Sequence, residues 1–426
     1  MQDASAGTLV EDLFRREAGR LVSALARLLG PSRLALAEDV VHDALVAAMQ
    51  AWRFGPPRDP TAWILEVAKR RAIDVIRRER RIEPNARELD TGALFDAGPE
   101  LERALDVALS PEADAQNQLA MMFAICDGAL STETHVTLIL RLLSGLSPPE
   151  IARAFLVDVP TIERRLSRGR ARLKELGALQ DVAAQGEVRA RQPSVERALY
   201  LVFNEGYHGS DPESPLLPAM CADAVRLTEL LLESNAVDPV PLHALAALFC
   251  FNGARLAARI DGEGVIVPLA EQDRSRWNGA LVERGVRHLG ESAAGDHFTR
   301  WHLEAGIAFE HTRAPSVGDT DWARIVDYYD ALVAIAPGPV VALNRALAVA
   351  ELRGVEAGRE AIGALAGDPK LEGYSFYWAA RADIERRSGR AEEAAALYRR
   401  AAMLAKSRAE RASYERRLGV NPSGTS

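Results

Sequence analysis

Residues 147–173, SPPEIARAFLVDVPTIERRLSRGRARL, predict two short helices joined by a tight turn. Ser147 is a suitable N-cap, and Glu150 lies three residues on, where it completes a capping box. Asp158 is expected to cap the second helix, with Pro160 in its first turn. Apolar residues at spacings of four and three then give this helix one buried stripe: Ile162, Leu166, Gly169, Leu173 and Leu176.

The opposite face of the second helix is basic. Its first turns can enter a major groove while later arginines meet phosphates. A basic amphipathic helix is more often a solvated face, but the short spacing from the preceding helix favours a helix-turn-helix. The candidate DNA-binding residues on this face are Thr161, Arg164, Arg165, Arg168 and Arg172.

The distribution of charge matters more than its sum. The chain has 426 residues, 48% of them hydrophobic, and a net charge of -8, which by itself argues against a nucleic-acid partner. Residues 69–81 nevertheless hold seven Lys and Arg against two acids, as do residues 153–174. Between them, residues 83–114 hold nine acids against two arginines, in a linker with one or two helical turns expected near 101–109. The order basic, acidic, basic indicates two DNA-binding regions around an acidic linker.

Other sequence features exclude several classes of protein. The N-terminal stretch MQDASAGTLVEDLF lacks the basic and apolar regions of a signal peptide, and no transmembrane run is evident, so a cytoplasmic protein is expected. Cys126, Cys221 and Cys250 are far apart, which predicts buried thiols and neither disulfides nor a zinc site. No metal or other cofactor is expected.

The chain before the acidic linker reads as three helices. They are expected at 8–29, at 32–52 and from Pro60 onward, where Asp59 is the N-cap, and the Gly- and Pro-rich stretch FGPPRD (54–59) separates the last two. In the second helix the predicted buried face is Val41, Ala44, Leu45, Ala48, Met49 and Trp52, and the predicted exposed cluster is Glu38, Asp39, His42 and Asp43.

The second half of the chain is also mostly helical in pattern. Residues 343–365 and 379–404 recur at roughly the 34-residue period of tetratricopeptide repeats, with Gly354 and Gly389 at the same inter-helix turn. One strand-like stretch, 259–269, predicts a small hairpin or an extended loop. An all-α fold is therefore expected, with a second linker at 180–193.

With these parts placed, the chain resembles an extracytoplasmic-function (ECF) sigma factor of the subgroup with a tetratricopeptide-like C-terminal extension. AEDVVHDALVAAMQAW and PTAWILEVAKRRAIDVIRRERR resemble the sigma-2 domain, and LILRLLSGLSPPEIARAFLVDVPTIERRLSRGRARL resembles the sigma-4 domain. ALYLVFNEGYHGS, EQDRSRW, TDWARIVDYYDAL and PVVALNRALAVA resemble the extension. The division that follows is a sigma-2 domain at 1–82, a linker at 83–114, a sigma-4 helix-turn-helix domain at 115–179, a linker at 180–193 and a helical extension at 194–426.

The resemblance implies a transcription initiation factor and not an enzyme. Its partners would be core RNA polymerase and promoter DNA, and no membrane is implied. The polymerase-facing residues would be Asp39, His42 and Asp43, although the residues alone favour a solvated polar face. The sigma-4 helix would read the minus-thirty-five element, and an arginine-rich reading face favours a guanine there.

For the minus-ten element, the resemblance implies a base-capturing loop after Trp52 and a DNA-contacting helix after Pro60. ECF sigma factors commonly have Asn at the second position of the dipeptide that is Lys69-Arg70 here, a change that favours phosphate affinity over base readout. The candidate minus-ten residues are Phe54, Arg58, Lys69, Arg70, Arg71, Arg77 and Arg78.

The extension would regulate the sigma domains in cis. Its candidate regulatory residues can bind a partner or ligand, or can form a buried polar network that ties helices together. They are Phe203, Asn204, Glu205, Tyr207, Asp273, Arg274 and Trp277. The alternative function is a one-component DNA-binding regulator with a ligand- or protein-binding tail and no polymerase. An enzyme is disfavoured because no nucleophile, base and orienting group occur together in the pattern.

Overall fold

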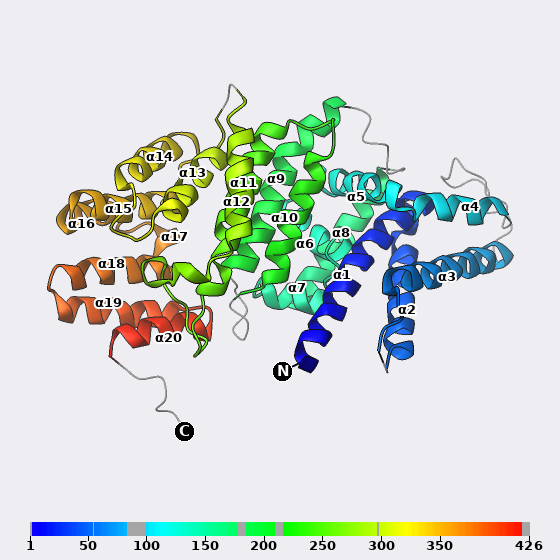
Figure 1. Ribbon diagram of the computed structural model, residues 1–426, viewed down its shortest axis with the longest axis horizontal. Helices are drawn as coiled ribbons and strands as arrows, with labels where there is room; N and C mark the ends of the chain where they lie inside the picture. Colours follow the sequence, from blue (N-terminus) through cyan, green and yellow to red (C-terminus); the bar gives the residue numbers. More distant parts are fainter. Residues whose placement is uncertain are drawn as a thin grey trace. The chain divides into compact units, whose positions relative to one another are not determined.

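The computed structural model describes residues 2–53, 55–82, 99–176, 185–208, 216–295 and 298–419, which are helical apart from turns and one isolated bridge between Ile260 and Ile266 (Figure 1). The all-α fold class predicted from the sequence is confirmed. The chain forms two compact units, Met1–Val202 with Glu233–Val237 and Phe203–Leu232 with Asp238–Ser426.

The first unit is built around the long helix α1, which packs against helices on either side of the acidic stretch. Leu21 and Leu25 of α1 are fully buried. The elements of this unit are α1 (Gln2–Leu29), η1 (Pro31–Arg33), α2 (Leu34–Ala51), α3 (Pro60–Ile82), α4 (Pro99–Ala108), α5 (Pro111–Ile125), α6 (Thr132–Leu142), α7 (Pro148–Ala154), α8 (Val159–Glu175) and most of α9 (Gln185–His208).

Two glycines let α1 approach the turn between α6 and α7. A Cβ at Gly19 would lie 2.1 Å from the carbonyl oxygen of Leu143, which no side chain can tolerate. Gly145 has a φ of +68° and sits against the backbone of Arg15. The ion pair between Arg15 and Glu150, at 3.0 Å, closes the same contact.

The predicted helix-turn-helix is present with its predicted caps. Ser147 and Glu150 form the capping box at the start of α7, and Asp158 accepts a hydrogen bond from the Thr161 backbone at the start of α8. The buried residues of α8 are Ile162, Leu166, Gly169 and Leu173, as the spacing predicts. Gly169 is needed because Leu138 of α6 lies where its Cβ would be.

Three local predictions are wrong. Glu38 is buried, with 7% of its surface exposed, because two arginines distant in sequence bind its carboxylate, whereas Met49 is 65% exposed. The helical turns expected near 101–109 of the acidic linker are present as the longer helix α4, residues 99–108, and α5 begins at Pro111. Residues 185–193 of the second predicted linker belong to α9, which accommodates Pro193 while burying Val188 and Val195.

The second unit is organised around α11, most of whose side chains are buried. It packs against α10, α12 and α13. The remaining elements are α10 (Pro218–Leu232), α11 (Pro239–Ala254), η3 (Leu256–Ala258), η4 (Leu269–Glu271), η5 (Arg274–Arg276), α12 (Gly279–Ser292), α13 (Arg300–Arg313), α14 (Trp322–Ile335), α15 (Pro339–Arg353), α16 (Val355–Gly363), α17 (Pro369–Glu372), α18 (Ser375–Arg387), α19 (Ala391–Leu404) and α20 (Arg408–Arg417).

Within the described residues, one stretch, Pro239–Ala258, is long and apolar enough to cross a membrane. This stretch contains α11, and Phe249, Cys250 and Phe251 in it are completely buried. It is thus the central core helix of the second unit.

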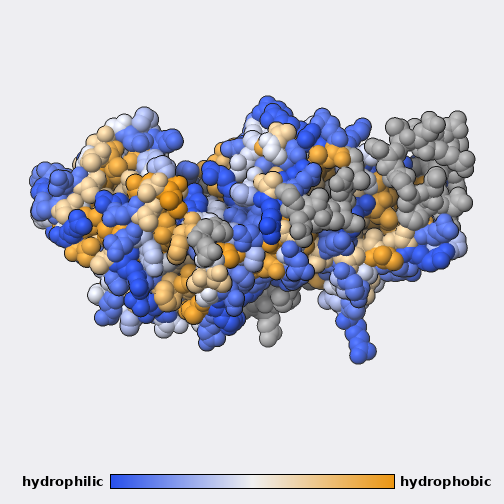
Figure 2. Space-filling view, turned by 90° about the horizontal axis from the view of Figure 1, so that it is seen from above, coloured by the Kyte–Doolittle hydropathy of each residue, from blue (hydrophilic) through white to orange (hydrophobic). Residues whose placement is uncertain are grey.

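The C-terminal helices pack as successive pairs, α13 with α14, α15 with α16, and α18 with α19. Gly354 and Gly389 both have positive φ, 93° and 80°, at the turns between α15 and α16 and between α18 and α19, as the sequence spacing predicts. The assignment of these pairs to tetratricopeptide repeats stays a prediction. Figure 2 shows hydrophobic patches on this end of the chain, at the left.

Candidate nucleic-acid interface

The reading face of α8 is open to solvent at its centre. Arg164 and Arg168 are exposed, and Arg165 is half-buried. Arg164 donates a 2.7 Å hydrogen bond to the hydroxyl of Thr161, so two of the predicted reading residues already touch. Four predicted residues therefore share one face: Thr161, Arg164, Arg165 and Arg168.

Arg172 differs from the other predicted reading residues because carboxylates hold it. Its Nε donates to Asp127 at 2.8 Å and its Nη1 to Glu175 at 3.0 Å. The hydrogen bond from Arg172 lowers the pKa of Asp127, and burial opposes this only in part. Arg191 of α9 also pairs with Asp127, at 3.3 Å. Arg172 thus fixes the end of α8 to the turn after α5.

A buried ion cluster joins α8 to α2, and sequence reasoning missed it. Arg170 donates two hydrogen bonds to Glu38, at 3.0 and 2.7 Å, and Arg141 of α6 donates a third at 2.7 Å. The partners are more than 100 residues apart in sequence, so no local signal could identify them. Glu38 therefore ties α2 to α6 and α8.

The second basic surface lies along α3. Arg70, Arg71, Arg77 and Arg78 are exposed, Lys69 is half-buried, and Arg58 is exposed in the loop before the helix. Arg70 pairs with Glu66 of its own helix at 2.7 Å. Phe54 lies outside the described residues.

The acidic helix α4 lies against this surface. Lys69 pairs with Asp106 at 2.5 Å and Arg77 with Glu102 at 3.6 Å. Leu101 and Leu105 on the other side of α4 are buried and contribute about 1.5–3 kcal/mol each. Two of the predicted minus-ten cations are therefore neutralised by the linker, whereas Arg71 and Arg78 have no carboxylate partner in the described part of the chain.

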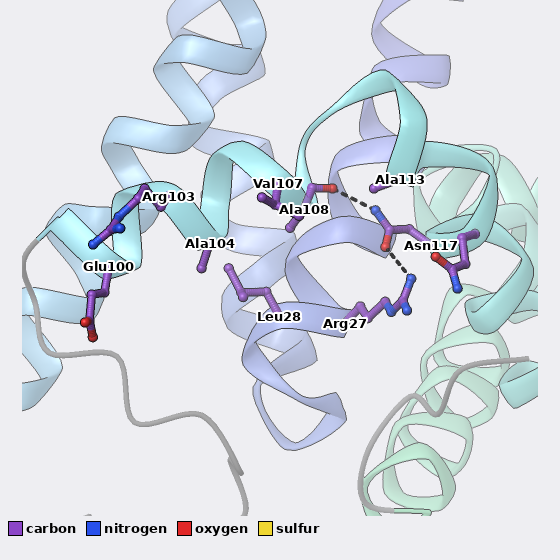
Figure 3. Close-up of a pocket in the computed structure, with 10 residues that line it drawn as sticks. Arg27, Leu28, Glu100, Arg103, Ala104, Val107, Ala108, Ala113 and Asn117 are labelled. Carbon is purple, nitrogen blue, oxygen red and sulfur yellow. Dashed lines mark hydrogen bonds between the residues drawn. The ribbon is translucent and has the colours of Figure 1, made fainter. Parts of the chain in front are cut away.

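A cavity of about 650 Å³ lies among α1, α4 and α5 (Figure 3). Asn117 spans one side of it, where its amide accepts a hydrogen bond from Arg27 and donates one to the Ala108 carbonyl. Leu28, Ala104 and Val107 supply an apolar lining. The cavity exists only while α4 rests on α1.

The predicted polymerase-facing residues are grouped on α2. Asp39, His42 and Asp43 are all exposed, and the described residues offer no partner to these side chains. They lie on the face of α2 opposite Val40, Val41 and Ala44, which are buried. This acidic face is accessible to another protein.

The predicted regulatory residues fall into two groups. Phe203 and Tyr207 are buried, and Phe203 stacks on Phe249 with ring centroids 4.4 Å apart. Asn204 and Glu205 beside them are half-buried. A Cβ at Gly206 would meet α10 at 2.8–2.9 Å, so this position requires glycine.

The second group of predicted regulatory residues fixes a loop. Asp273 caps η5 by accepting hydrogen bonds from the backbone and the hydroxyl of Ser275. Arg274 donates to the carbonyls of His311 and Ala314, at 2.6 and 2.8 Å, and its guanidinium lies over Trp277. No cluster of metal-ligating side chains occurs within the residues that the structure describes.

Comparisons with known proteins assign these surfaces to a family. Residues 13–82 match sigma-70 region 2, and residues 128–173 match sigma-70 region 4. RNA polymerase sigma factor CnrH of Cupriavidus metallidurans is 30% identical over 145 residues, which are 33% of this chain and 72% of CnrH. The chain belongs to the sigma-70 family. It is an ECF-like sigma factor with a C-terminal extension, as the sequence indicates.

The extension is matched separately. Residues 191–293 fit a family of unknown function, DUF6596. An uncharacterized protein of Rhizobium meliloti is 34% identical over 398 residues, 92% of each chain, so the similarity includes both the sigma domains and the extension.

Membership of this family indicates the binding partners and the functional class of the sigma factor. It acts in transcription initiation with core RNA polymerase and promoter DNA, and it is not an enzyme. The basic surface of α3 belongs to region 2, and α8 belongs to region 4. The acidic helix α4 lies in the segment between the two matches.

Proposed function

We propose that α8 of this ECF-type sigma factor reads the minus-thirty-five element, that α3 and its preceding loop bind the minus-ten element, and that the extension regulates both in cis. The observation that carries the proposal is the capped helix-turn-helix with Arg164 and Arg168 exposed on one face. Arg164, Arg165 and Arg168 can contact bases and phosphates directly because no carboxylate binds them within the described residues.

The described arrangement corresponds to a closed state of the sigma domains. Asp106 forms an ion pair with Lys69, and Glu102 forms one with Arg77. The ion pair of Glu38 with Arg170 holds α2 against α8. Minus-ten DNA must displace α4, which buries Leu101 and Leu105. Core polymerase, docked on Asp39, His42 and Asp43, would supply the binding energy for that displacement.

Cis regulation has a direct contact in its support. Arg191, at the start of the segment that matches the DUF6596 family, donates to the Phe123 carbonyl and pairs with Asp127. Asp127 also holds Arg172 at the end of α8. A change in the extension can thus alter the support of the recognition helix.

The five-part domain division and the cytoplasmic location remain part of this proposal.

Run-off transcription tests the recognition helix. Arg164→Ala and Arg165→Ala together should abolish promoter-specific transcription by core polymerase, because two base or phosphate contacts are lost. Binding of core polymerase should be unchanged, since neither residue pairs with α2 within the described residues. Unchanged promoter choice by the double variant would refute the assignment.

The alternative, a one-component regulator without polymerase, is disfavoured by the region 2 match. The same assay separates the two functions. Specific operator binding by the protein alone, with no transcription when core polymerase is added, would favour the alternative.

A further inference from the structure

Three arginines gather around Tyr207 in the second unit. Arg255 donates a 2.8 Å hydrogen bond to the Tyr207 hydroxyl, and the Arg259 guanidinium lies 3.8 Å from the centroid of the Tyr207 ring. Arg274 lies near them because it is the first residue of η5, which packs against η3. Helix η3 lies between Arg255 and Arg259 in the sequence. Three positive charges from three points of the sequence therefore meet at one place.

These arginines have no carboxylate partner within the described residues. Arg255 bonds to Tyr207 and Asn252, and Arg274 bonds to two backbone carbonyls. Arginines elsewhere in this unit are commonly paired, as Arg345 is with Asp330 and Arg387 with Glu351. A buried charge without a counter-charge has a high desolvation free energy. We therefore expect a cluster of three such charges to bind a counter-ion.

Hydrogen-bond donors in the cluster are left over. Among the described residues, four buried N–H groups have no acceptor: Nε of Arg255, Nε of Arg259, Nη2 of Arg274 and Nε1 of Trp277. Arg255 is only 9% exposed, whereas Arg259 and Arg274 are half-buried, so the cluster is not sealed from solvent. Unsatisfied hydrogen-bond donors that cluster with several positive charges are typical of an anion-binding site.

The surrounding titratable groups report the same positive field. Burial, together with Arg259 and Arg255, lowers the pKa of His208 to about 3. His311 also has a pKa of about 3, through burial, Arg255 and Arg274. Burial alone would raise the pKa of Tyr207, but Arg255 and Arg259 outweigh it and the pKa is lowered. Asp319 is the carboxylate that acts on Arg274, and the two form no ion pair within the described residues.

We propose that Arg255, Arg259 and Arg274 form a binding site in the extension for a small phosphate-bearing ligand. A phosphate monoester carries nearly two charges and several acceptor oxygens, which suits three guanidiniums and an indole N–H better than a single carboxylate does. This site is distinct from both DNA-contacting surfaces, which lie in the other unit. It stands whether or not the extension regulates transcription.

The test is binding of inorganic phosphate to the full chain, measured by calorimetry and by the shift in melting temperature. Arg259→Met keeps an aliphatic side chain against Tyr207 but removes the charge, and Arg353→Met, at an exposed position in α15, is the matched control. Phosphate should stabilise the wild type and the control, and Arg259→Met should weaken its binding about tenfold or more.

A second comparison separates ligand binding from a structural role. Without phosphate, Arg259→Met should melt at the same temperature as the wild type or higher, because like-charge repulsion is removed. A large drop in its melting temperature, or phosphate binding equal to the control, would overturn the proposal. Tighter binding of succinate than of phosphate would overturn the choice of ligand.

Discussion

At the scale of single residues, Arg168 and Arg172 of α8 separate DNA contact from structural support. Arg168 is exposed and Arg172 is held by Asp127 and Glu175. We expect Arg168→Ala to weaken binding to the minus-thirty-five element about tenfold with no change in melting temperature. Arg172→Ala should lower the melting temperature, because the buried carboxylate of Asp127 loses its main hydrogen-bond donor. Thermal unfolding and promoter binding of the two variants, side by side, check this.

The same pair predicts a dependence on pH. The hydrogen bond from Arg172 holds the pKa of Asp127 below its unfolded value of about 3.9. Stabilisation from a lowered carboxyl pKa is complete above the unfolded pKa and is lost as the pH falls through the folded one. The difference in unfolding free energy between wild type and Arg172→Ala should thus be full at pH 7 and shrink below about pH 4. Urea titrations at pH 7 and below about pH 4 measure this difference in unfolding free energy. An equal difference under the two conditions would contradict this role of Asp127.

Residues whose role is local could be predicted from the sequence, and residues whose partners are distant could not. Ser147, Glu150 and Asp158 act within three or four positions along the chain, and all three caps are present. Glu38 was assigned to the exposed face because its own helix periodicity says so, but Arg141 and Arg170 bury it. Tyr207 and Arg274 are candidate residues in the sequence, but no local signal indicates that Arg255 and Arg259 lie beside them.

At the scale of elements, helix α4 acts as a cover for α3. Reversing the charges of Glu102 and Asp106 to Lys should release α4, because both would then repel Arg77 and Lys69. The free protein should bind duplex DNA about tenfold more tightly at low salt, with a steeper dependence on salt, since freed cations can meet phosphates. Fluorescence anisotropy over a range of salt concentrations gives both quantities.

Added positive charge alone would also raise affinity for DNA, so a control is needed within α4. Glu100 is exposed and does not pair with α3. The variants Glu102→Lys and Glu100→Lys change the net charge equally, and only the first should disturb the pairing with Arg77. Equal gains in affinity from the two single variants would show that α4 does not cover α3.

Elements were predicted better in their kind than in their limits. The helical type of nearly every segment follows from apolar spacing, but composition predicts only one or two helical turns near 101–109 and a linker at 185–193. In both cases packing outweighs composition. Leu101 and Leu105 anchor α4, and Val188 and Val195 anchor α9 on either side of Pro193.

At the scale of the whole molecule, the connection between the sigma domains and the extension runs through α9. Arg191 is the side chain of this helix that reaches both the Phe123 carbonyl and Asp127. Because Asp127 also binds Arg172, loss of Arg191 leaves the support of α8 incomplete without removing any DNA contact. We therefore expect the extension to influence promoter recognition through this carboxylate.

We predict that Arg191→Ala will change run-off transcription in the same direction as deletion of residues 191–426. The change should be about two- to fivefold, because one partly exposed ion pair contributes up to about 1 kcal/mol. Arg189→Ala is the matched control, since Arg189 is exposed on the same helix and is not paired with Asp127. If the deletion alters transcription strongly while Arg191→Ala behaves like Arg189→Ala, the extension acts by another route. Wild-type output from the truncated chain would remove cis regulation altogether, because the truncation takes away Arg191 together with every helix from α10 to α20.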